Sequence, residues 1–213
     1  MNKLQKLREE YAGAGLTRDT VNQDPFEQFK LWFDQARDAG IPEPNAMSLA
    51  TASITSAPSQ RTVLIKDFDQ NGFVFFTNHG SRKARQIQEN AAVSALLPWY
   101  ALQRQVKIEG HVGRISEDES RKYFYSRPRK SQVGAWASRQ SEVLTSRHEL
   151  DARFTRISEQ FRGQEIPLPE FWGGYCIQPH WLEFLQGRTH RLHDRILYTR
   201  NEGSGWDISR LSP

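Results

Sequence analysis

The 213-residue sequence predicts a largely antiparallel sheet, in an α+β domain or a closed barrel. About eight or nine strand candidates mostly follow one another directly, a pattern that favours antiparallel neighbours. Helical periodicity is confined to the beginning and the middle of the chain. There is no βαβ alternation and neither GxGxxG nor GxxxxGK[ST], which argues against dinucleotide-binding and P-loop folds.

Length and composition predict one folded domain over residues 21–213, preceded by an arm with a short helix over residues 1–20. Hydrophobic residues make up 37% of the chain, and twelve Phe, six Trp and six Tyr add large buried areas. The net charge of +4 is mild and does not by itself argue for a nucleic-acid partner. Because Cys176 is the only cysteine and no apolar run suits a membrane span or a signal peptide, we expect a cytoplasmic protein without a membrane partner.

Two amphipathic helices are predicted before residue 41. In the first, Leu4, Leu7 and Tyr11 recur at intervals of three and four residues, and the stretch GAG ends it. Asp24 can cap the second helix, which ends at Gly40. Its apolar face carries Phe26, Phe29, Trp32, Phe33 and Ala36.

From residue 46 the pattern changes to strands. Strands are predicted over residues 46–54, 60–68, 73–78, 91–99 and 103–115, and again over residues 174–179, 181–186, 195–200 and 206–211. Two helices separate these groups, one capped by Ser116 and ending before Pro128, the other over residues 146–163. The stretch DQNG, residues 69–72, is typical of a turn between strands.

The stretch RTVLIK places Arg61 and Lys66 at the two ends of an apolar strand segment. Two interpretations are open at this point. The charged ends simply reach water, or the two cations hold an anion beside an exposed backbone edge.

The stretch TNHGSRKARQIQEN, residues 77–90, combines a strand end with a helix start. Gly80 allows a sharp turn, and Ser81 can cap the helix. Arg82 and Lys83 lie in its first turn, where the helix dipole disfavours cations. An anion held by the free N–H groups and both side chains explains this placement, so the stretch predicts a phosphate site. Solvated surface cations are the alternative.

The stretch RTHRLHDR, residues 188–195, concentrates positive charge near the end of the chain. If residues 191–195 are extended, Arg191, His193 and Arg195 project from one side of the strand. Three adjacent cationic groups repel one another unless something negative lies between them. An exposed strand end with a salt bridge through Asp194 is the alternative.

Other catalytic arrangements are not indicated. The six histidines show no HExxH spacing, and a lone cysteine excludes thiolate zinc sites, so no metal is predicted. No GxSxG nucleophile elbow is present.

Six motifs occur in an order that resembles the pyridoxine/pyridoxamine 5'-phosphate oxidases. They are RTVLIK, FFTNHGSRKARQI, PW followed by RQVKIEG, YFYSRPRKSQVGAWASRQS, PLPEFWGGY and QGRTHRLHDRILY. The resemblance runs from about residue 7 to the C-terminal RLSP, and its six motifs with compatible spacings make it specific.

The resemblance implies an FMN-binding split β-barrel, mainly antiparallel with flanking helices, in a homodimer with FMN between the subunits. It implies oxidation of pyridoxamine 5'-phosphate or pyridoxine 5'-phosphate to pyridoxal 5'-phosphate in the biosynthesis or salvage of that cofactor. Molecular oxygen would reoxidise the flavin and yield hydrogen peroxide, and the amine substrate would also release ammonia.

Carried over by motif, the resemblance implies a set of FMN contacts. They are Arg61, Thr62, Val63, Leu64, Ile65, Lys66, Phe76, Thr77, Arg82, Lys83, Gln105, Gln140, Ser141, Leu185 and Arg195. Arg82 and Lys83 would hold the FMN phosphate, in agreement with the anion site predicted at the helix start.

The resemblance also implies a set of substrate contacts. They are Arg8, Glu9, Glu10, Tyr11, Lys66, Tyr123, Arg127, Ser131, Arg191, Leu192 and His193. Tyr123 and Arg127, four residues apart on a predicted helix, would share a face and bind the substrate phosphate. Arg191 and His193, the implied catalytic residues, would lie over the pyridine ring and orient C4' toward the flavin.

One position departs from the family pattern. The family usually has Trp in EFWQG, where the ring contacts the flavin, whereas this chain reads EFLQG with Leu185. Leucine keeps an apolar contact but loses aromatic area, so we expect FMN to bind more weakly or turnover to be altered.

Two other classes of function are alternatives to the oxidase. A flavin- or pyridoxal-phosphate-binding carrier without rapid catalysis is favoured only by Leu185. A basic nucleic-acid-binding barrel is suggested only by the pI of about 9.3. The clearest basic clusters match small-phosphate sites instead, so we expect no nucleic-acid partner.

Overall fold

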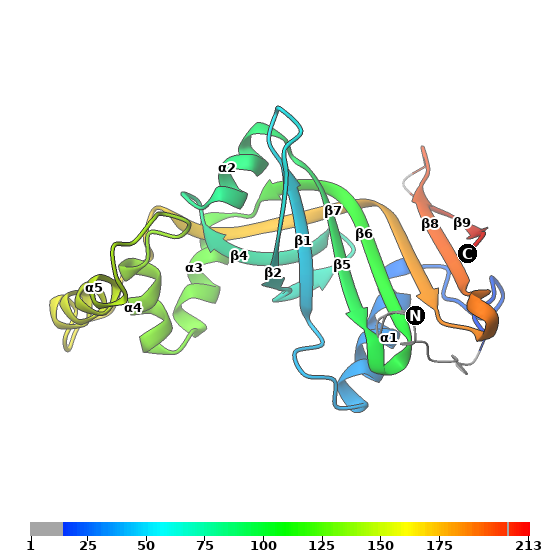
Figure 1. Cartoon of the computed structure of the whole chain (residues 1–213), viewed down its shortest axis with the longest axis horizontal. Helices are drawn as coiled ribbons and strands as arrows, with labels where there is room; N and C mark the ends of the chain where they lie inside the picture. Colours follow the sequence, from blue (N-terminus) through cyan, green and yellow to red (C-terminus); the bar gives the residue numbers. More distant parts are fainter. Residues whose placement is uncertain (1–14, 204) are drawn as a thin grey trace, which may run out of the picture.

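The computed structural model describes residues 15–203 and 205–213, and within them it shows one antiparallel sheet of nine strands (Figure 1). The strands are β1 (Ala46–Ala52), β2 (Pro58–Leu64), β3 (Asp67–Asp69), β4 (Gly72–Asn78), β5 (Ala92–Trp99), β6 (Arg104–Arg114), β7 (Trp172–Gln186), β8 (Asp194–Arg200) and β9 (Trp206–Leu211). Their order is β2-β1-β5-β6-β7-β4-β3, with β8 paired to β7 and β9 to β8. All of these pairs are antiparallel, so the predicted α+β fold with a largely antiparallel sheet is confirmed.

The long strand β7 organises the sheet because its two halves have different neighbours. Residues 172–177 of β7 pair with β4, whereas residues 181–186 pair with β8. Strand β6 runs along both halves. The β4 side and the β8 side therefore diverge from one strand, and Figure 1 shows them toward opposite ends of the curled sheet.

Five α-helices flank the described sheet. They are α1 (Pro25–Asp38), α2 (Arg82–Glu89), α3 (Glu117–Ser126), α4 (Arg129–Ala137) and α5 (Arg147–Gln160). The predicted caps are confirmed: the side chains of Asp24, Ser81 and Ser116 each accept a hydrogen bond from a first-turn N–H, and Ser116 forms a capping box with Glu119. None of the described helices is both long enough and apolar enough to cross a membrane.

The described residues form two apolar clusters. The larger one packs the buried face of α1 against the sheet, and there Phe29 and Phe73 are fully buried with ring centroids 4.9 Å apart. The smaller one joins α3, α4 and α5 to the start of β7 through Phe124, Ile166 and Trp172. Figure 1 shows these three helices together beyond the β4 side of the sheet. This second cluster places helical residues beside the ends of β4 and β7.

Four of the predicted strands were wrong in extent. The two strands predicted over residues 174–179 and 181–186 are one continuous strand, β7. Pro179 is tolerated inside it because the register shifts at Glu109/Gly110 of the facing strand, where regular ladder bonds are interrupted. The strand predicted over residues 60–68 breaks at residues 65–66, because the chain changes partner there: the N–H of Ile65 still donates to Asn45 beside β1, whereas the N–H of Lys66 donates to Val74 of β4. The first predicted strand ends at Ala52, before the turn to β2.

Helix α4 was not predicted from the sequence. No side chain caps its first turn, which follows Pro128, and Gly134 lies in its middle, so the local sequence lacks the usual helix signals. The preceding helix α3 ends at Ser126. The prediction that Arg127 shares a helix with Tyr123 is therefore wrong. Arg127 is extended, with φ −74° and ψ 147°, as expected for a residue before proline. The helix predicted around Leu4–Tyr11 lies outside the described residues.

Candidate functional site

One large cavity of about 980 Å³ opens between the β2–β4 side of the sheet and the helical cluster. Strands β2 and β4, the start of α2, the α3–α4 junction and the first residue of β7 form its walls. Its lining is Ser59, Gln60, Arg61, Thr62, Val63, Leu64, Lys66, Phe76, Thr77, Asn78, Arg82, Lys83, Tyr123, Arg127, Pro128, Ser131, Gly134, Ala135, Ser138, Gln140, Ser141 and Trp172. Five of these described residues are Arg or Lys and none is Asp or Glu. The cavity is therefore suited to anionic ligands.

Lys83 lines this cavity and is 5% exposed. Its ammonium group donates to Thr77 Oγ1 at 3.1 Å, Gln140 Oε1 at 3.3 Å and Ser81 Oγ at 3.5 Å, all uncharged acceptors. Burial, and secondly the nearby Arg61, lower the pKa of Lys83 to about 8. A buried ammonium surrounded by uncharged acceptors and further cations fits a bound anion.

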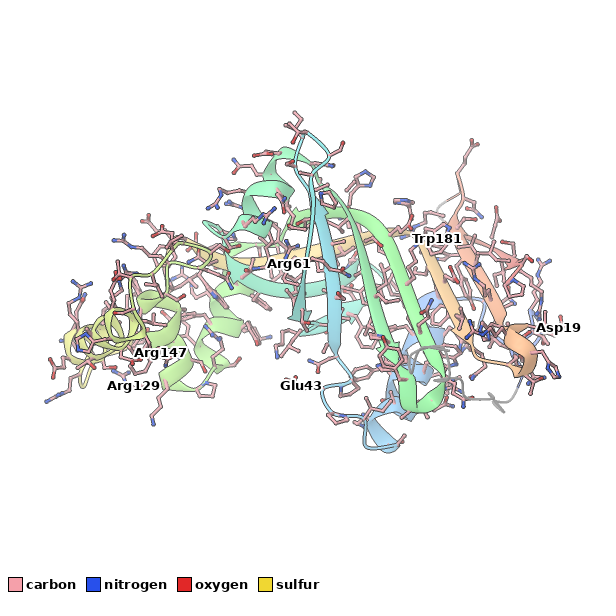
Figure 2. The ribbon with its side chains drawn as sticks, in the orientation of Figure 1. Asp19, Glu43, Arg61, Arg129, Arg147 and Trp181 are labelled. Atoms are coloured by element: carbon pink, nitrogen blue, oxygen red, sulfur yellow. The ribbon has the colours of Figure 1, made fainter. Side chains whose placement is uncertain are left out.

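Arg61, on β2, lines the cavity together with Lys83 of α2 and lies near the middle of the molecule in Figure 2. Its guanidinium donates to the carbonyl of Leu49 at 3.0 Å, to Thr51 Oγ1 at 2.7 Å and to Ser59 Oγ. Burial, and secondly Arg82, lower the pKa of Arg61. Together with Arg82 in the first turn of α2, the cluster collects three positive charges where the sequence predicted a phosphate site.

Gln140 connects the loop after α4 to Lys83 and to the end of β4. Its Oε1 accepts hydrogen bonds from Thr77 Oγ1 at 2.9 Å, from Lys83 Nζ and from the backbone N–H of Asn78 at 3.4 Å. Ser141, the next residue, lines the cavity with a positive φ of 75°. The loop after α4 is thus held against the end of β4.

A second cationic position lies at the α3–α4 junction. The guanidinium of Arg127 stacks over Trp172 at 4.7 Å and lies 5.8 Å from the ring of Phe124. Its Nη1 is buried and has no hydrogen-bond partner among the described residues. Burial lowers the pKa of Arg127. Burial also raises the pKa of Tyr123, and the positive charge of Arg127 lowers it by a smaller amount. A buried donor without a partner fits an acceptor supplied by a ligand.

Three aromatic side chains form the wall between the two cationic positions. Phe76 stacks on Tyr123 with centroids 3.9 Å apart and on Trp172 at 5.4 Å, and the interplanar angles are 21° and 12°. These rings give the cavity flat apolar surfaces next to its charged ends. Such a combination suits ligands that carry both an aromatic ring and a phosphate.

Most of the predicted site residues meet in this cavity. Those that line it are Arg61, Thr62, Val63, Leu64, Lys66, Phe76, Thr77, Arg82, Lys83, Tyr123, Arg127, Ser131, Gln140 and Ser141. Ile65 does not line it, because its side chain is buried in the larger apolar cluster. Arg8, Glu9, Glu10 and Tyr11 lie outside the described residues.

A second group of predicted residues lies on the other half of the sheet. Gln105 on β6, Leu185 on β7 and Arg195 on β8 are direct neighbours across three strands, and Arg191, Leu192 and His193 precede β8. None of these six residues lines the cavity described above. In Figure 2 Trp181, where β7 begins to pair with β8, lies well apart from Arg61. We refer to these six residues as the β8 group.

The segment before β8 is not extended as predicted. Residues 189–191 form a short 3₁₀ turn in which His190 and Arg191 have φ of 56° and 61°. Arg191, His193 and Arg195 therefore do not alternate along one strand. The Nδ1 of His193 accepts a hydrogen bond from the backbone N–H of Arg188 at 3.1 Å, which closes the turn. Asp194 forms ion pairs with Arg210 at 2.5 Å and with Arg188 at 3.6 Å, as in the alternative interpretation of this stretch as a salt-bridged strand end.

Three residues that shape the cavity or the β8 group were not predicted from the sequence. Trp172 lies within the PLPEFWGGY motif and lines the cavity but is not among the predicted site residues. Glu183 pairs with Arg195, and its position two residues before Leu185 on one strand face was the available signal. Gln86, four residues after Arg82 on α2, contacts the partners of Arg61, and no local signal indicated this.

Two family models match the chain. The model of pyridoxamine 5'-phosphate oxidase matches residues 33–161, and the model of the pyridoxine 5'-phosphate oxidase C-terminal dimerisation region matches residues 172–213. The first match contains nearly all the cavity lining, and the second contains β7, β8 and β9. The C-terminal match supports the formation of a homodimer.

Relatives and solved structures agree with these matches. A pyridoxine/pyridoxamine 5'-phosphate oxidase of Rippkaea orientalis is 58% identical over 97% of this chain and 98% of its own length, and one of Rubrobacter xylanophilus is 54% identical over 99% and 96%. The structure of PhzG from Burkholderia lata, with tetrahydrophenazine-1-carboxylic acid bound, matches with a TM-score of 0.88 and 31% identity over 94% of this chain and 99% of that chain. A pyridoxamine 5'-phosphate oxidase-related, FMN-binding protein of Nostoc punctiforme shares the fold with a TM-score of 0.72 and 16% identity, over 91% of this chain and 100% of that one. By its family models and its relatives alike, this chain is a member of the pyridoxine/pyridoxamine 5'-phosphate oxidase family.

Proposed function

We propose that the protein oxidises pyridoxamine 5'-phosphate or pyridoxine 5'-phosphate to pyridoxal 5'-phosphate with FMN and molecular oxygen. The amine reaction consumes O2 and water and releases ammonia and hydrogen peroxide, whereas the alcohol reaction consumes O2 and releases hydrogen peroxide. The observation that carries this proposal is the cavity, with five cations, no described carboxylate and two separate cationic positions. Two phosphorylated aromatic ligands need this arrangement.

Cys176 has no cysteine with which to pair, which suits the predicted cytoplasmic location.

The cluster of Arg61, Arg82 and Lys83 fits the phosphate of FMN. Burial, and secondly Arg61, lower the pKa of Lys83, and a phosphate dianion would supply a counter-charge for its ammonium group. Strand β2 and Phe76 would contact the flavin beyond the phosphate, and Gln140 and Ser141 would close over it. When bound, FMN supplies the two-electron oxidation of the substrate and then transfers the electrons to oxygen.

Arg127 fits the phosphate of the substrate. Its unpartnered Nη1 offers a charge-assisted hydrogen bond, and Tyr123 and Ser131 add hydroxyl donors on the same side of the cavity. Trp172 covers one face of this guanidinium, 4.7 Å from the ring centroid. Lys66 lines the cavity and is exposed, and it would reach the substrate from the β2 side.

In the homodimer, we infer that the β8 group of one subunit completes the cavity of the other. The β8 group does not line the cavity of its own chain, and it lies within the matched dimerisation region. Arg195, Leu185 and Gln105 would then contact the flavin. Arg191 and His193 would lie over the substrate ring and orient C4' for oxidation.

Flavin spectroscopy tests the proposal directly. The purified protein should be yellow, and anaerobic pyridoxamine 5'-phosphate should bleach it. Under air, peroxide and pyridoxal 5'-phosphate should form in equal amounts. A protein that binds FMN without turnover would instead be a carrier.

Variants at the proposed substrate contacts and at the proposed FMN contacts should lose different properties. Arg191→Ala or His193→Ala should lower turnover far more than FMN affinity, whereas Arg82→Ala should weaken FMN binding itself. Equal loss of flavin in all three variants would contradict these roles.

A further inference from the structure

Gln86 of α2 joins the helix to β1 and β2 through two hydroxyl groups. It is 6% exposed, and its Oε1 accepts hydrogen bonds from Thr51 Oγ1 at 2.7 Å and Ser59 Oγ at 2.6 Å. Its Nε2 donates to the carbonyl of Ala57 at 3.3 Å, which fixes the orientation of the amide. Gln86 does not line the cavity.

The same two hydroxyls contact Arg61. The Nη1 of Arg61 donates to Thr51 Oγ1 at 2.7 Å, and its Nη2 donates to Ser59 Oγ. A guanidinium only donates and an amide oxygen only accepts, so each hydroxyl must give its single hydrogen to Gln86. That leaves both hydroxyl oxygens with their lone pairs toward Arg61. Gln86 thereby sets the direction of every hydrogen bond in the network.

The network leaves part of Arg61 for a ligand. The contacts to Leu49, Thr51 and Ser59 use three of its five N–H donors. The N–H on Nε and one N–H on Nη2 are outside the network, and Arg61 lines the cavity together with Arg82 and Lys83. The guanidinium is therefore held by one edge while the other edge is available at the predicted phosphate position.

We propose that Gln86 is a positioning residue, which acts through Thr51 and Ser59 to hold Arg61 for the phosphate of the bound flavin nucleotide. This inference rests on the proposed function, because it takes FMN as the ligand of the cavity. If Gln86 only tied α2 to the sheet, its loss would displace Arg82 and Lys83 of that helix and weaken FMN binding whether or not Arg61 is present. If it positions Arg61, its loss weakens the binding of a phosphorylated flavin only.

The test compares FMN with riboflavin, which lacks the phosphate. Full-length protein is stripped of flavin, and the Kd of each flavin is measured by fluorescence quenching for wild type, Gln86→Met and Gln88→Met. Gln88 is exposed on the same helix and serves as the matched control. Gln86→Met should weaken FMN about tenfold, since one ordered charge-assisted contact is lost, and should change riboflavin by less than about twofold. Gln88→Met should leave both Kd values within about twofold of wild type.

A double-variant comparison separates positioning from packing. In an Arg61→Ala background, Gln86→Met should cause no further loss of FMN affinity, because its effect passes through Arg61. Thr51→Val removes one acceptor of Arg61 but leaves Gln86 bonded to Ser59 and Ala57, and it should also weaken FMN selectively, so the proposal stays testable if Gln86→Met does not fold. Equal weakening of both flavins, additive losses in the double variant, or an unchanged FMN-to-riboflavin ratio in Thr51→Val would overturn the role of Gln86. A wild-type protein that binds neither flavin would instead overturn the proposed function.

Discussion

Arg195 and Glu183 form a two-pronged ion pair across β7 and β8, with Nε–Oε1 at 2.6 Å and Nη2–Oε2 at 2.9 Å. The Glu183 side chain is 2% exposed, whereas Arg195 keeps 29% exposure. As hydrogen-bond acceptor, the Glu183 carboxylate raises the pKa of Arg195. The fork of the guanidinium matches the carboxylate in plane, so Glu183 determines where Arg195 points. The proposed flavin contact of Arg195 therefore depends on a residue buried behind it.

Glu183→Gln should destabilise the fold by about 1–3 kcal/mol, because it removes a buried charged acceptor. Denaturant unfolding measures this change. The matched control is Glu109→Gln, which breaks the pair with Lys107, a pair in which each side chain is 37% exposed. That control should cost at most about 1 kcal/mol. Equal stability losses in the two variants would contradict a special role for the buried pair.

Trp172→Leu should raise the KM for pyridoxamine 5'-phosphate about 2- to 30-fold with little change in kcat. The physical reason is the loss of the stacked face under Arg127, a contact of about 0.5–2 kcal/mol. Trp172→Phe keeps an aromatic face and should raise KM less. Steady-state kinetics measures both constants.

Trp136→Leu is the control for this substitution. Trp136 packs on Phe161 and Phe171 in the same helical region, whereas the described rings that lie against Arg127 are Phe124 and Trp172. Its loss should lower stability without raising KM. A similar KM increase in Trp136→Leu and Trp172→Leu would show that cluster packing, not the cation–π contact, controls substrate binding.

Leu185→Trp should tighten FMN binding about 2- to 10-fold and change the turnover rate. Leu185 lies directly between Gln105 and Arg195 in the sheet register, so a larger ring there would face the proposed flavin position. Aromatic contacts contribute about 0.5–1.5 kcal/mol beyond area burial. Leu31→Trp, at an exposed position of α1, is the control and should change neither quantity. Unchanged FMN affinity together with an unchanged rate in Leu185→Trp would refute the prediction.

Features set by a short stretch of chain were predictable from the sequence. Ser81 caps α2 as predicted, because the signal consists of a turn residue and the first helical turn. The placement of Arg82 and Lys83 in the first turn of that helix followed from the same local argument. The family resemblance then predicted 14 residues that meet in one cavity.

Features set by strand register were not predictable. The continuity of β7 through Pro179 depends on the bulge at Glu109/Gly110 in another strand. The contact between Gln86 and the hydroxyls beside Arg61 joins residues 27 and 35 positions apart in the chain. The turn at Arg191 has a positive φ that no glycine signals. Each of these depends on tertiary neighbours, which local patterns do not record.

Lys83 should make FMN affinity depend on pH. Its pKa in the folded protein, about 8, lies below the ordinary value of 10.5, because burial and Arg61 disfavour its charge. The protein without flavin therefore loses this charge as pH rises through about 8, while FMN phosphate favours the charged form. FMN affinity should fall between pH 7 and pH 9, by up to about tenfold per pH unit above 8. Stability without flavin has the opposite pH dependence: it should rise between pH 8 and 10.5, because the unfolded chain binds the additional proton.

Lys83→Arg separates this effect from other titrations. Arginine stays charged throughout this range, so FMN affinity of the variant should be nearly constant between pH 7 and pH 9, whatever its absolute value. Riboflavin affinity of the wild type should also be nearly constant, because no phosphate contacts the ammonium group. Fluorescence titrations at each pH provide all three curves. A wild-type FMN curve that stays flat, or a Lys83→Arg curve that falls as steeply as wild type, would exclude Lys83 as the titrating group at the phosphate position.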